Sequence, residues 1–544
     1  MKDIFNRRQR FSLRKYSIGV CSVLLGTALF AAGSKTVLAD EAENPADSSS
    51  DVVLGGVEAD KGISLSKSAT ENSSAPTSYN AAAVVQPSVV ENLQHEDDEN
   101  TGEQANVGQP ATVSREATGT SGFRNSGEVT SRVVSNWNGF VSALNDSSIR
   151  NITISGNVVA TGDNGNTDNG RANSVDRTVT INSQGRNLII QGRNNQASLD
   201  LLSNSLKFTG SSAWNLVFKN LQLATGNSKG VMDLSSTAGF NTVTFENVES
   251  QGSSLYGGGG NTDVIVKGKT TSTVSDSYRS ANGQTQYVQR NVGPAGHSVL
   301  RREANIHDAK SVTVADGASL TLNRSSQGDG INLAGGSTVR VNDGASLTIN
   351  MNTNNGTESA RYHNAGIFME HGGTVVTGKD SKLTLNTSIG QAISLGMGRP
   401  ADGLTHLDRW GGYGTGNAFR RNGNSSLTIG EHASFNFTGR DGLVFGNNAT
   451  FTTGENSHVR FENKGRGTAI DFGDNSRVVF GKKSTNTFHS VGKGPKSGGG
   501  PSGSYNAYNY IGLNENSSIL VDDYATFRVQ MDNRGANPWD DVIN

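Results

Sequence analysis

Two stretches of the chain share one pattern: SVTVADGASLTLN at residues 311–323 and STVRVNDGASLTIN at residues 337–350. In both, apolar and polar residues alternate on either side of an Asp-Gly pair. Alternation with period two indicates a strand that is buried on one side, and Asp-Gly indicates a turn between strands. A third short strand, Ile331–Leu333, lies between the copies and is closed by Gly335 and Gly336. The pattern predicts units of three short strands and three turns.

The same unit recurs through the second half of the chain. A short-strand unit repeated every 20 to 50 residues or so is typical of a solenoid, in which each coil buries its apolar side by stacking on the next. We therefore predict an all-β parallel β-helix, with Val, Leu and Ile inside and Ser, Thr, Arg and Asn facing water. The later copies are TVVTGKDSKLTLN (374–386), SLTIGEHASFNF (426–437), TFTTGENSHVRF (450–461), RVVFGKKSTNTF (477–488) and ILVDDYATFRV (519–529), with third strands GIFM (366–369), AISL (392–395), GLVF (442–445), AIDF (469–472) and YIGL (510–513).

Three asparagines, Asn323, Asn350 and Asn386, occupy the same place in successive units. Asparagine tolerates a left-handed backbone, and its side-chain amide can bond to an identical amide in the next coil. We predict a stacked asparagine ladder at one corner, as a structural device and not as a binding site.

Composition limits the remaining possibilities. The 544 residues carry a net charge of −2, so no general affinity for nucleic acid is expected. The hydrophobic fraction is 33%, which suits a thin repetitive core and a disordered tail better than one large globular core. Cys21 is the only cysteine, and it lies in a segment that we expect to be removed. We expect no disulfide, no metal site and no cofactor in the mature chain.

The first 39 residues have the features of an export signal. Basic residues precede an apolar run from Ser17 to Ala32, and Val37-Leu38-Ala39 predicts cleavage after Ala39. The motif before and within the apolar run consists of Phe11, Ser12, Leu13, Arg14, Lys15, Gly19 and Ser22. It resembles the YSIRK-G/S signal peptide of Gram-positive surface proteins, chiefly streptococcal and staphylococcal, with Phe and Leu in place of the usual Tyr and Ile. The resemblance implies export and attachment to the cell wall by sortase.

Residues 40–130 are rich in Ser, Ala, Asn, Glu and Asp and poor in aromatic residues. Such a segment cannot bury enough apolar surface to offset its ordering entropy, so we predict a disordered acidic spacer. We predict the β-helix over residues 131–544, with irregular coils at 131–270, an insertion at 271–308 and regular coils at 309–544.

A short helix is expected just before the first strands. Asn136 or Ser135 can cap it, and it would run through Leu144 with Trp137 and Phe140 on its apolar face, together with Val141. Because the first coil of a β-helix exposes both its edge and its core, an amphipathic helix at this place would close the open end.

A second resemblance concerns the β-helix itself. Arg171, Asp176, Arg177 and the strand at 178–182, after the helix start at Asn136, resemble the pectate-lyase-like adhesive modules of Gram-positive wall proteins. The resemblance implies a right-handed, single-stranded β-helix and an adhesive, wall-associated role. A wall protein of this class ends in an LPxTG anchor, an apolar span and a basic tail. Since these features do not follow the last strand, we expect a truncated sequence and attachment to peptidoglycan through an anchor outside it.

Three excursions leave the repeat, at 350–366, 396–424 and 488–510. In a solenoid, insertions at one corner often build the binding surface. A loop tryptophan beside Arg, Asp and Gly can stack on a sugar ring while its neighbours bond to hydroxyls, or it can anchor the loop on the coil. The candidate binding residues are Arg361, Tyr362, Arg399, His406, Asp408, Arg409, Trp410 and Tyr413.

Three functions are compatible with this sequence. The first is a secreted, monomeric, wall-associated adhesin that presents loops to a host glycan or an extracellular protein. The second is a polysaccharide lyase or glycoside hydrolase, which needs acids clustered around Ca²⁺ or a pair of carboxylates at a suitable separation. The repeating strands carry no evident cluster of this kind, so no catalytic residue is predicted and no enzyme activity is expected. The third is a passive stalk. We favour the adhesin.

Overall fold

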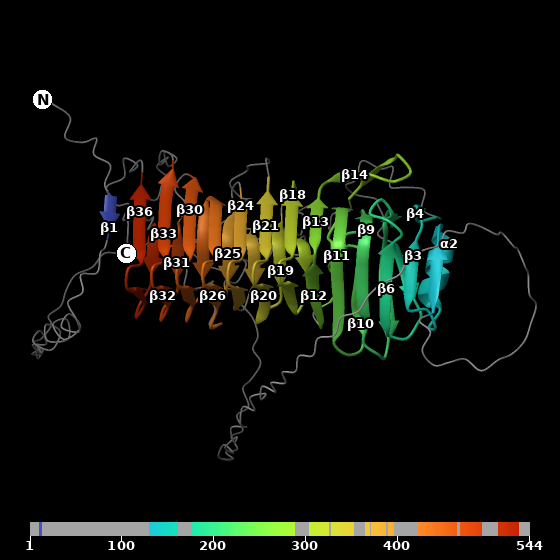
Figure 1. Cartoon of the computed structure of the whole chain (residues 1–544), viewed down its shortest axis with the longest axis horizontal. Helices are drawn as coiled ribbons and strands as arrows, with labels where there is room; N and C mark the ends of the chain where they lie inside the picture. The colour runs from blue at the N-terminus through green and yellow to red at the C-terminus, as the bar shows by residue number, and fades with distance from the viewer. Residues whose placement is uncertain are drawn as a thin grey trace, which may run out of the picture. The chain divides into compact units, whose positions relative to one another are not determined.

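The structure is a computed structural model, and its coils of β-strands stack along one axis (Figure 1). The signal residues after Ser12, the expected cleavage site at Ala39 and the expected spacer as far as residue 129 lie outside the described residues. No helix within the described part is long and apolar enough to span a membrane. The structure describes residues 10–12, 130–161, 177–259, 261–288, 304–325, 328–352, 365–369, 372–387, 390–396, 423–464, 468–491 and 510–531.

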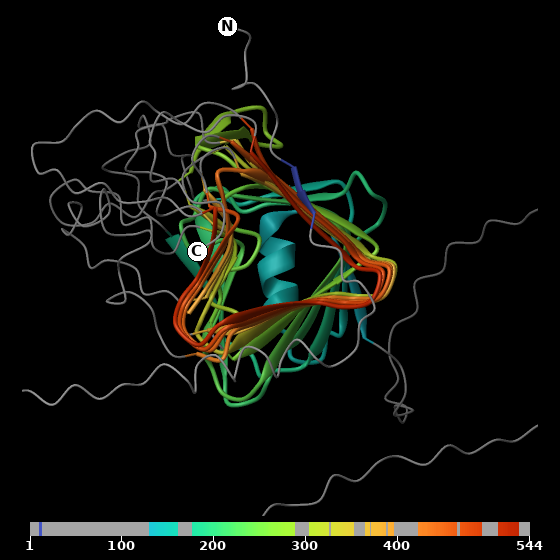
Figure 2. The same cartoon turned by 90° about the vertical axis from the view of Figure 1, so that its left-hand side faces the viewer.

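The coils have three faces, and the view along the stack shows their triangular outline (Figure 2). Strands pair in parallel with those of the preceding and following coils on each face. Faces 1 and 2 form one sheet, whereas face 3 consists of a three-stranded sheet in the N-terminal coils and a seven-stranded sheet in the C-terminal coils, counted over the described residues. The predicted right-handed parallel β-helix is confirmed.

The strands follow the order face 1, face 2, face 3 in each regular coil. Face 1 contains β2 (Ser131–Val134), β3 (Asn151–Ile154), β6 (Asn187–Gly192), the first parts of β9 (Asn215–Thr225) and β11 (Asn241–Gly252), β12 (Thr262–Lys267), β17 (Ser311–Val314), β20 (Ser337–Val341), β23 (Gly373–Thr377), β26 (Ser426–Ile429), β29 (Thr450–Thr453), β32 (Arg477–Phe480) and β35 (Ser518–Val521). Face 2 contains β4 (Asn157–Val159), β7 (Ser198–Asp200), the second parts of β9 and β11, β13 (Lys269–Val274), β18 (Ser319–Arg324), β21 (Ser346–Met351), β24 (Lys382–Thr387), β27 (Ser434–Gly439), β30 (His458–Lys464), β33 (Thr485–Val491) and β36 (Thr526–Met531).

Face 3 completes the triangle, and two further pairings lie outside it. Face 3 contains β5 (Arg177–Ile181), β8 (Asn204–Gly210), β10 (Met232–Thr237), β16 (Ala304–His307), β19 (Asp329–Leu333), β22 (Ala365–Met369), β25 (Gln391–Leu395), β28 (Asp441–Phe445), β31 (Ile470–Phe472) and β34 (Ile511–Leu513). Outside it, β14 (Ser277–Arg279) and β15 (Thr285–Tyr287) form a hairpin, and β1 (Arg10–Ser12) pairs antiparallel with β36.

The apolar residues of the repeated phrases form continuous inward columns. Leu322 pairs in register with Ile349, and Ile349 with Leu385. All three side chains are buried, as are their counterparts on face 3, Ile331 and Ile367. Stacking therefore buries what one coil alone would leave exposed, and hydrophobic burial of about 25 cal/mol per Å² of apolar area favours each added coil.

Every regular coil turns from face 1 to face 2 through four residues, beginning with 315–318. One residue of each turn has a left-handed backbone, such as Gly317 with φ 64° and Gly344 with φ 62°. The N–H of Gly317 donates to the Asp343 carbonyl at 2.9 Å, and later coils repeat this bond between turns. The left-handed position is occupied in later coils by Asp380, His432, Asn456, Lys483 and Tyr524.

Tyr524 is the residue least suited to this position, since a left-handed backbone costs a non-glycine residue about 1–2 kcal/mol. Its φ is 58° and its side chain is 83% exposed, so it gains little from packing. Tyr524→Gly should raise the free energy of unfolding by about 0.5–1 kcal/mol, measured by urea denaturation. Ala525→Gly, at the next residue, where φ is not positive, should lower it by a similar amount. Equal effects of both substitutions would contradict the explanation.

The three predicted ladder asparagines lie one above another. The Asn350 amide donates to Asn323 Oδ1 at 2.9 Å, and the Asn386 amide donates to Asn350 Oδ1 at 2.8 Å. These residues belong to β18, β21 and β24, and none of them has a left-handed backbone. The expected link to left-handed corner residues is therefore wrong, because a side-chain amide in a strand already meets its in-register neighbour in the next coil.

The predicted capping helix is confirmed as α2 (Trp137–Asn145), which lies within the triangular outline (Figure 2). Asn136 is the N-cap and accepts from the Gly139 N–H at 2.9 Å. Trp137 and Phe140 are buried. At the other end of the helix, the buried Arg186 donates to the Leu144 and Ile149 carbonyls, both at 2.9 Å, and burial lowers its pKa to about 10. Arg186 thus satisfies a carbonyl of the last helical turn and attaches the cap to the coils.

A polar layer interrupts the interior where the two sheets of face 3 meet. Ser250 and Ser272 stand in register between Leu223 and Leu322 in an otherwise apolar column. The Asn305 amide reaches Ser272 Oγ at 3.1 Å. Among the described residues, neither Ser250 Oγ nor Asn305 Oδ1 has a hydrogen-bond partner, so this layer contributes less stability than its apolar neighbours.

The boundaries of the expected insertion at 271–308 require correction. Residues 271–274 belong to β13, which pairs with β11 and β18, and residues 304–307 form β16. The interruption therefore lies between these strands, at 275–303. Its start was misplaced because Thr270 and Ser272 are polar although they point inward, which weakens the alternation that defines a strand in the sequence.

Candidate functional site

Between β13 and β34, the strand bounds place the long connections at the borders of face 3. From face 2 to face 3 run the connections 275–303, 352–364 and 492–510, and from face 3 to face 1 runs 396–425. The corner between faces 1 and 2 keeps its four-residue turn throughout this region. The β-helix therefore places its sequence variation along one side, which is the arrangement of a solenoid with a binding face.

The predicted binding residues belong to two of these connections. Arg361 and Tyr362 are in the connection 352–364. The other six are in 396–425, and they are Arg399, His406, Asp408, Arg409, Trp410 and Tyr413. All eight lie outside the described residues. The strands on either side nevertheless fix where both connections begin and end, so the two groups leave from opposite borders of the same face.

The outer side of face 3 differs from the outer sides of the other faces. One outward register column of face 3 contains His307, Phe368, Ser394, Val444 and Asp471, each at most 7% exposed, and also Asn332 and Gly512, which are half-buried. The outward column of face 1 that begins at Thr313 contains half-buried threonines and valines, together with Arg340 and Leu520, which are exposed. The expectation that all outward residues face water is therefore wrong for face 3. Period-two alternation identifies which residues point outward, but not whether the rest of the chain shields them.

His307 is the outward residue nearest to the junction of the two face 3 sheets. Its Nδ1 lies 3.0 Å from Asp308 Oδ2, and within the described part Nε2 has no hydrogen-bond partner. The ring packs against Gly257, where a Cβ atom would overlap it. The glycine run that begins at Gly257 thus makes room for the imidazole on the outer side of the coil.

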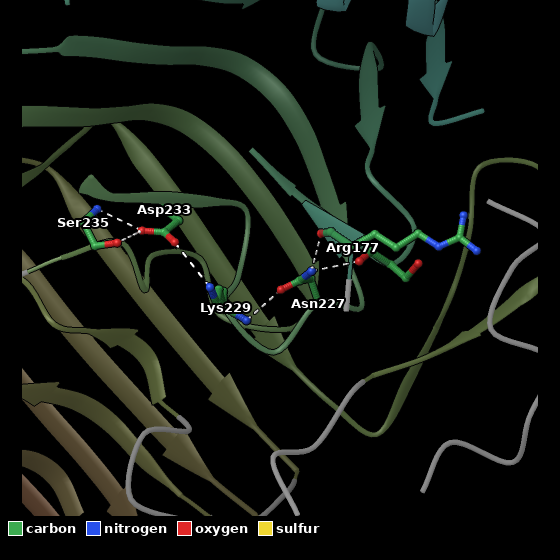
Figure 3. Close-up of polar contacts among 6 residues, drawn as sticks. Arg177, Asn227, Lys229, Asp233 and Ser235 are labelled. Carbon is green, nitrogen blue, oxygen red and sulfur yellow. Dashed lines mark hydrogen bonds and ion pairs between the residues drawn. The ribbon is translucent and has the colours of Figure 1, made fainter. Parts of the chain in front are cut away.

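The N-terminal end of face 3 carries a chain of polar contacts (Figure 3). The Asn227 amide donates to the Arg177 and Ser203 carbonyls, both at 2.8 Å, and so ties three coils together. Asp233 accepts from the Ser235 N–H at 2.9 Å, and the Lys229 ammonium lies 3.5 Å from its other oxygen. The Arg177 guanidinium points away from these groups (Figure 3). These contacts hold the coils together and leave the Arg177 side chain exposed.

The buried carboxylates of face 3 are bonded to structural donors. Asp329 Oδ1 accepts from the Ala365 N–H at 2.8 Å, and its other oxygen accepts from the Asn332 amide at 2.7 Å. Three coils further along, Asp441 accepts from the Thr468 N–H at 3.2 Å. Within the described ranges, no three His, Cys, Asp or Glu side chains are close enough to hold a metal ion.

Tyr510 ends the connection 492–510 and lies inside the coil. It is 3% exposed, and its hydroxyl donates to Asn463 Oδ1 at 2.9 Å. Burial raises the pKa of this phenol well above its usual value. Tyr510 thus anchors the end of a connection, which the run of tyrosines in this segment did not reveal.

Comparisons with protein families match two parts of the chain. Residues 6–30 match the model of the YSIRK type signal peptide, and residues 131–256 match that of the pectate lyase-like adhesive domain. The second match begins with β2 and ends at Tyr256, so it covers the N-terminal coils of the β-helix. The chain thus carries the signal peptide of an exported Gram-positive surface protein, and the similarity of its N-terminal coils to an adhesive domain supports a surface adhesin.

Two solved structures have similar chains. One, titled "L. reuters 100-23 SRRP", is 14% identical, with a TM-score of 0.42, and the match covers 77% of this chain and 98% of that one. The other, titled "L. reuteri 53608 SRRP", is 17% identical, with a TM-score of 0.34, and the match covers 72% of this chain and 99% of that one. A comparison with curated proteins finds no match.

Proposed function

We propose that this surface adhesin binds a host glycan or an extracellular protein through the long connections that border face 3. The observation that carries the proposal is the placement of these connections. All four, 275–303, 352–364, 396–425 and 492–510, adjoin face 3, whereas the corner between faces 1 and 2 consists of four-residue turns from β17 onward. Binding residues concentrate on loops held by a rigid scaffold, and the stacked coils are such a scaffold.

Between the two kinds of ligand, a glycan is favoured by the composition of the connection 396–425. Trp410 is flanked there by Asp408, Arg409 and glycines. An indole ring provides a flat apolar surface for a sugar ring, and the neighbouring charged groups can bond to its hydroxyls. The proposal assigns the chain no catalytic role, because the buried carboxylates of face 3 named above are already bonded to strand N–H groups and side chains.

A glycan array of the secreted chain, with Trp410→Ala beside the wild type, tests the proposal. We expect the variant to lose at least about tenfold in affinity for the glycans that the wild type binds, since truncation of a tryptophan that anchors a ligand costs about 2 kcal/mol or more of binding free energy. Tyr524→Ala is the matched control, because this exposed aromatic residue is on the corner between faces 1 and 2. Equal binding by all three proteins would remove Trp410 from the site. A wild type that binds neither glycans nor extracellular matrix proteins would favour a passive stalk.

A further inference from the structure

One of the long connections is described in part, and it folds back onto the coils. Residues 277–287 form the β14–β15 hairpin, in which Tyr278 pairs with Gln286 and Arg279 with Thr285. Tyr278 and Val288 pack with Ala224 of β9 in a small apolar cluster separate from the main core. The hairpin therefore packs against the ends of the face 2 strands, at the border with face 3, and Figure 1 shows β14 above the ends of β9 and β11.

A buried carboxylate on face 2 holds this hairpin. Asp200 is 1% exposed, and its side chain points outward because Leu199 beside it belongs to the core. It accepts from the Tyr278 hydroxyl at 2.8 Å, from the Ala281 N–H at 3.0 Å and from the Ser280 hydroxyl. It also accepts from the Leu202 N–H of its own coil at 3.0 Å. Three of its four donors thus come from residues about 80 positions away in the sequence.

The coil surface under the hairpin is shaped to receive it. Gly252 at the end of β11 has φ 98°, and a Cβ atom there would lie 2.8 Å from Cδ1 of Tyr278. Beside it, the Gln251 amide donates to the Arg279 carbonyl at 3.3 Å. The apolar cluster, the close approach at Gly252 and the hydrogen bonds therefore all hold the hairpin against the coils.

The tip of the hairpin presents polar side chains to solvent. Arg279, Asn282, Gln284 and Thr285 are exposed, and Asn282 Oδ1 accepts from the Gln284 N–H at 2.9 Å, which fixes the turn. Ala281 is the only exposed apolar side chain between Ser277 and Val288. Guanidinium groups donate hydrogen bonds, and amide groups both donate and accept them, so these side chains can pair with hydroxyls. The exposed groups thus suit a saccharide.

We propose that the β14–β15 hairpin is a pre-organised arm, that its tip binds saccharide hydroxyls, and that Asp200 is the positioning residue that locks it. The saccharide part rests on the proposed function, whereas the lock stands on the contacts of Asp200 alone. A loop that is ordered before binding loses less entropy when it binds, so locking the arm raises affinity without adding a ligand contact.

Hydrogen exchange of the mature wild-type chain and of Asp200→Asn tests the lock. The amide keeps the volume of the carboxylate but turns an N–H₂ group toward donors, so the hairpin should undock. We expect the amides of residues 275–288 to exchange about tenfold faster or more, and those of β21 and β24 to keep their rates. Because Asp200 also holds Leu202, a Tyr278→Phe and Ser280→Ala double variant removes donors from the hairpin side only. Unchanged exchange in both variants would overturn the lock.

Binding to the saccharides found for the wild type tests the arm. Asp200→Asn should weaken binding, and an Arg279→Ala and Gln284→Ala double variant should weaken it by about tenfold while leaving hairpin exchange unchanged. Asp233→Asn is the matched control, since this buried carboxylate accepts from the N–H and the hydroxyl of Ser235 within its own strand, β10. If both hairpin variants bind as tightly as the wild type, the hairpin is not a ligand arm even where the lock is confirmed. A wild type without saccharide binding removes the proposed function but leaves the exchange result standing.

Discussion

Phe461→Ala should lower the free energy of unfolding by about 3–5 kcal/mol, the usual loss for a large buried aromatic side chain. Phe461 is fully buried in the inward column of face 2. Its ring lies 4.9 Å from that of Phe435, 5.3 Å from that of Phe437 and 5.1 Å from that of Phe488, measured between centroids. The substitution therefore opens a cavity in three successive coils at once. Urea denaturation of the mature chain, followed by circular dichroism, measures the change.

The matched control is Arg460→Ala, one residue earlier in β30. Its side chain points outward and is exposed, so its removal should change the free energy of unfolding by less than about 0.5 kcal/mol. If the two variants were equally stable, the alternation of inward and outward residues along β30 would be contradicted.

Gly442→Ala should destabilise the chain by about 1–3 kcal/mol or more, because the added methyl group has no space. A Cβ atom at Gly442 would overlap the carbonyl oxygen of Ala469 in the next coil and would lie 2.7 Å from Cε2 of Phe461. The neighbouring coil carries Ala392 at the same register position. Alanine is therefore tolerated at this place in that coil, and the predicted loss at Gly442 comes from the atoms packed around Gly442 itself. Thermal and urea denaturation both measure the effect.

Gly344→Ala is the control for this substitution. Gly344 has φ 62° and open space around it, so alanine there costs only the left-handed backbone, about 1 kcal/mol. If Gly344→Ala lowered the free energy of unfolding more than Gly442→Ala, the coils would be packed less tightly on face 3 than the structure indicates.

The regular coils could be predicted from the sequence because their strands and turns are determined by residues close together in the chain. Val312, Leu320 and Ile331 alternate with polar residues, and Asp-Gly or its equivalent divides the strands. The copies then fix the register, because equivalent residues such as Leu322 and Ile349 stack. The helix cap at Asn136 follows in the same way from the residue type and the apolar spacing behind it.

The parts that sequence reasoning missed depend on contacts between residues far apart in the chain. Asp200 has no charged neighbour nearby in the sequence, and its partners Tyr278 and Ser280 lie in the expected insertion at 271–308. Arg186 likewise acts on Leu144, 42 residues before it. The signal for Asp200 was weak, a single charged residue among leucines, and Arg186 gave none, since it follows polar residues and a glycine just before β6.

For the candidate binding residues, the sequence predicted the segments but not the ligand contacts. Their segments were found from composition, as breaks in the repeat with aromatic and charged residues, and the strand bounds place these segments at the borders of face 3. Which of Arg399, Trp410 and Tyr413 contacts a ligand remains a prediction, because the repeat constrains the coils and not the connections between them.

Spin-label distances along one outward column test most directly whether the repeated phrases are successive coils. Cys21 lies in the signal peptide, so labelled cysteines can be placed freely in the mature chain. With one label at residue 313 and the second at 428, 452, 479 or 520, which share its column, we predict distances of about 14, 19, 24 and 29 Å, one strand spacing of about 4.8 Å for each coil. Distances that do not rise in equal steps, or that follow sequence separation instead of coil number, would contradict the stacked β-helix.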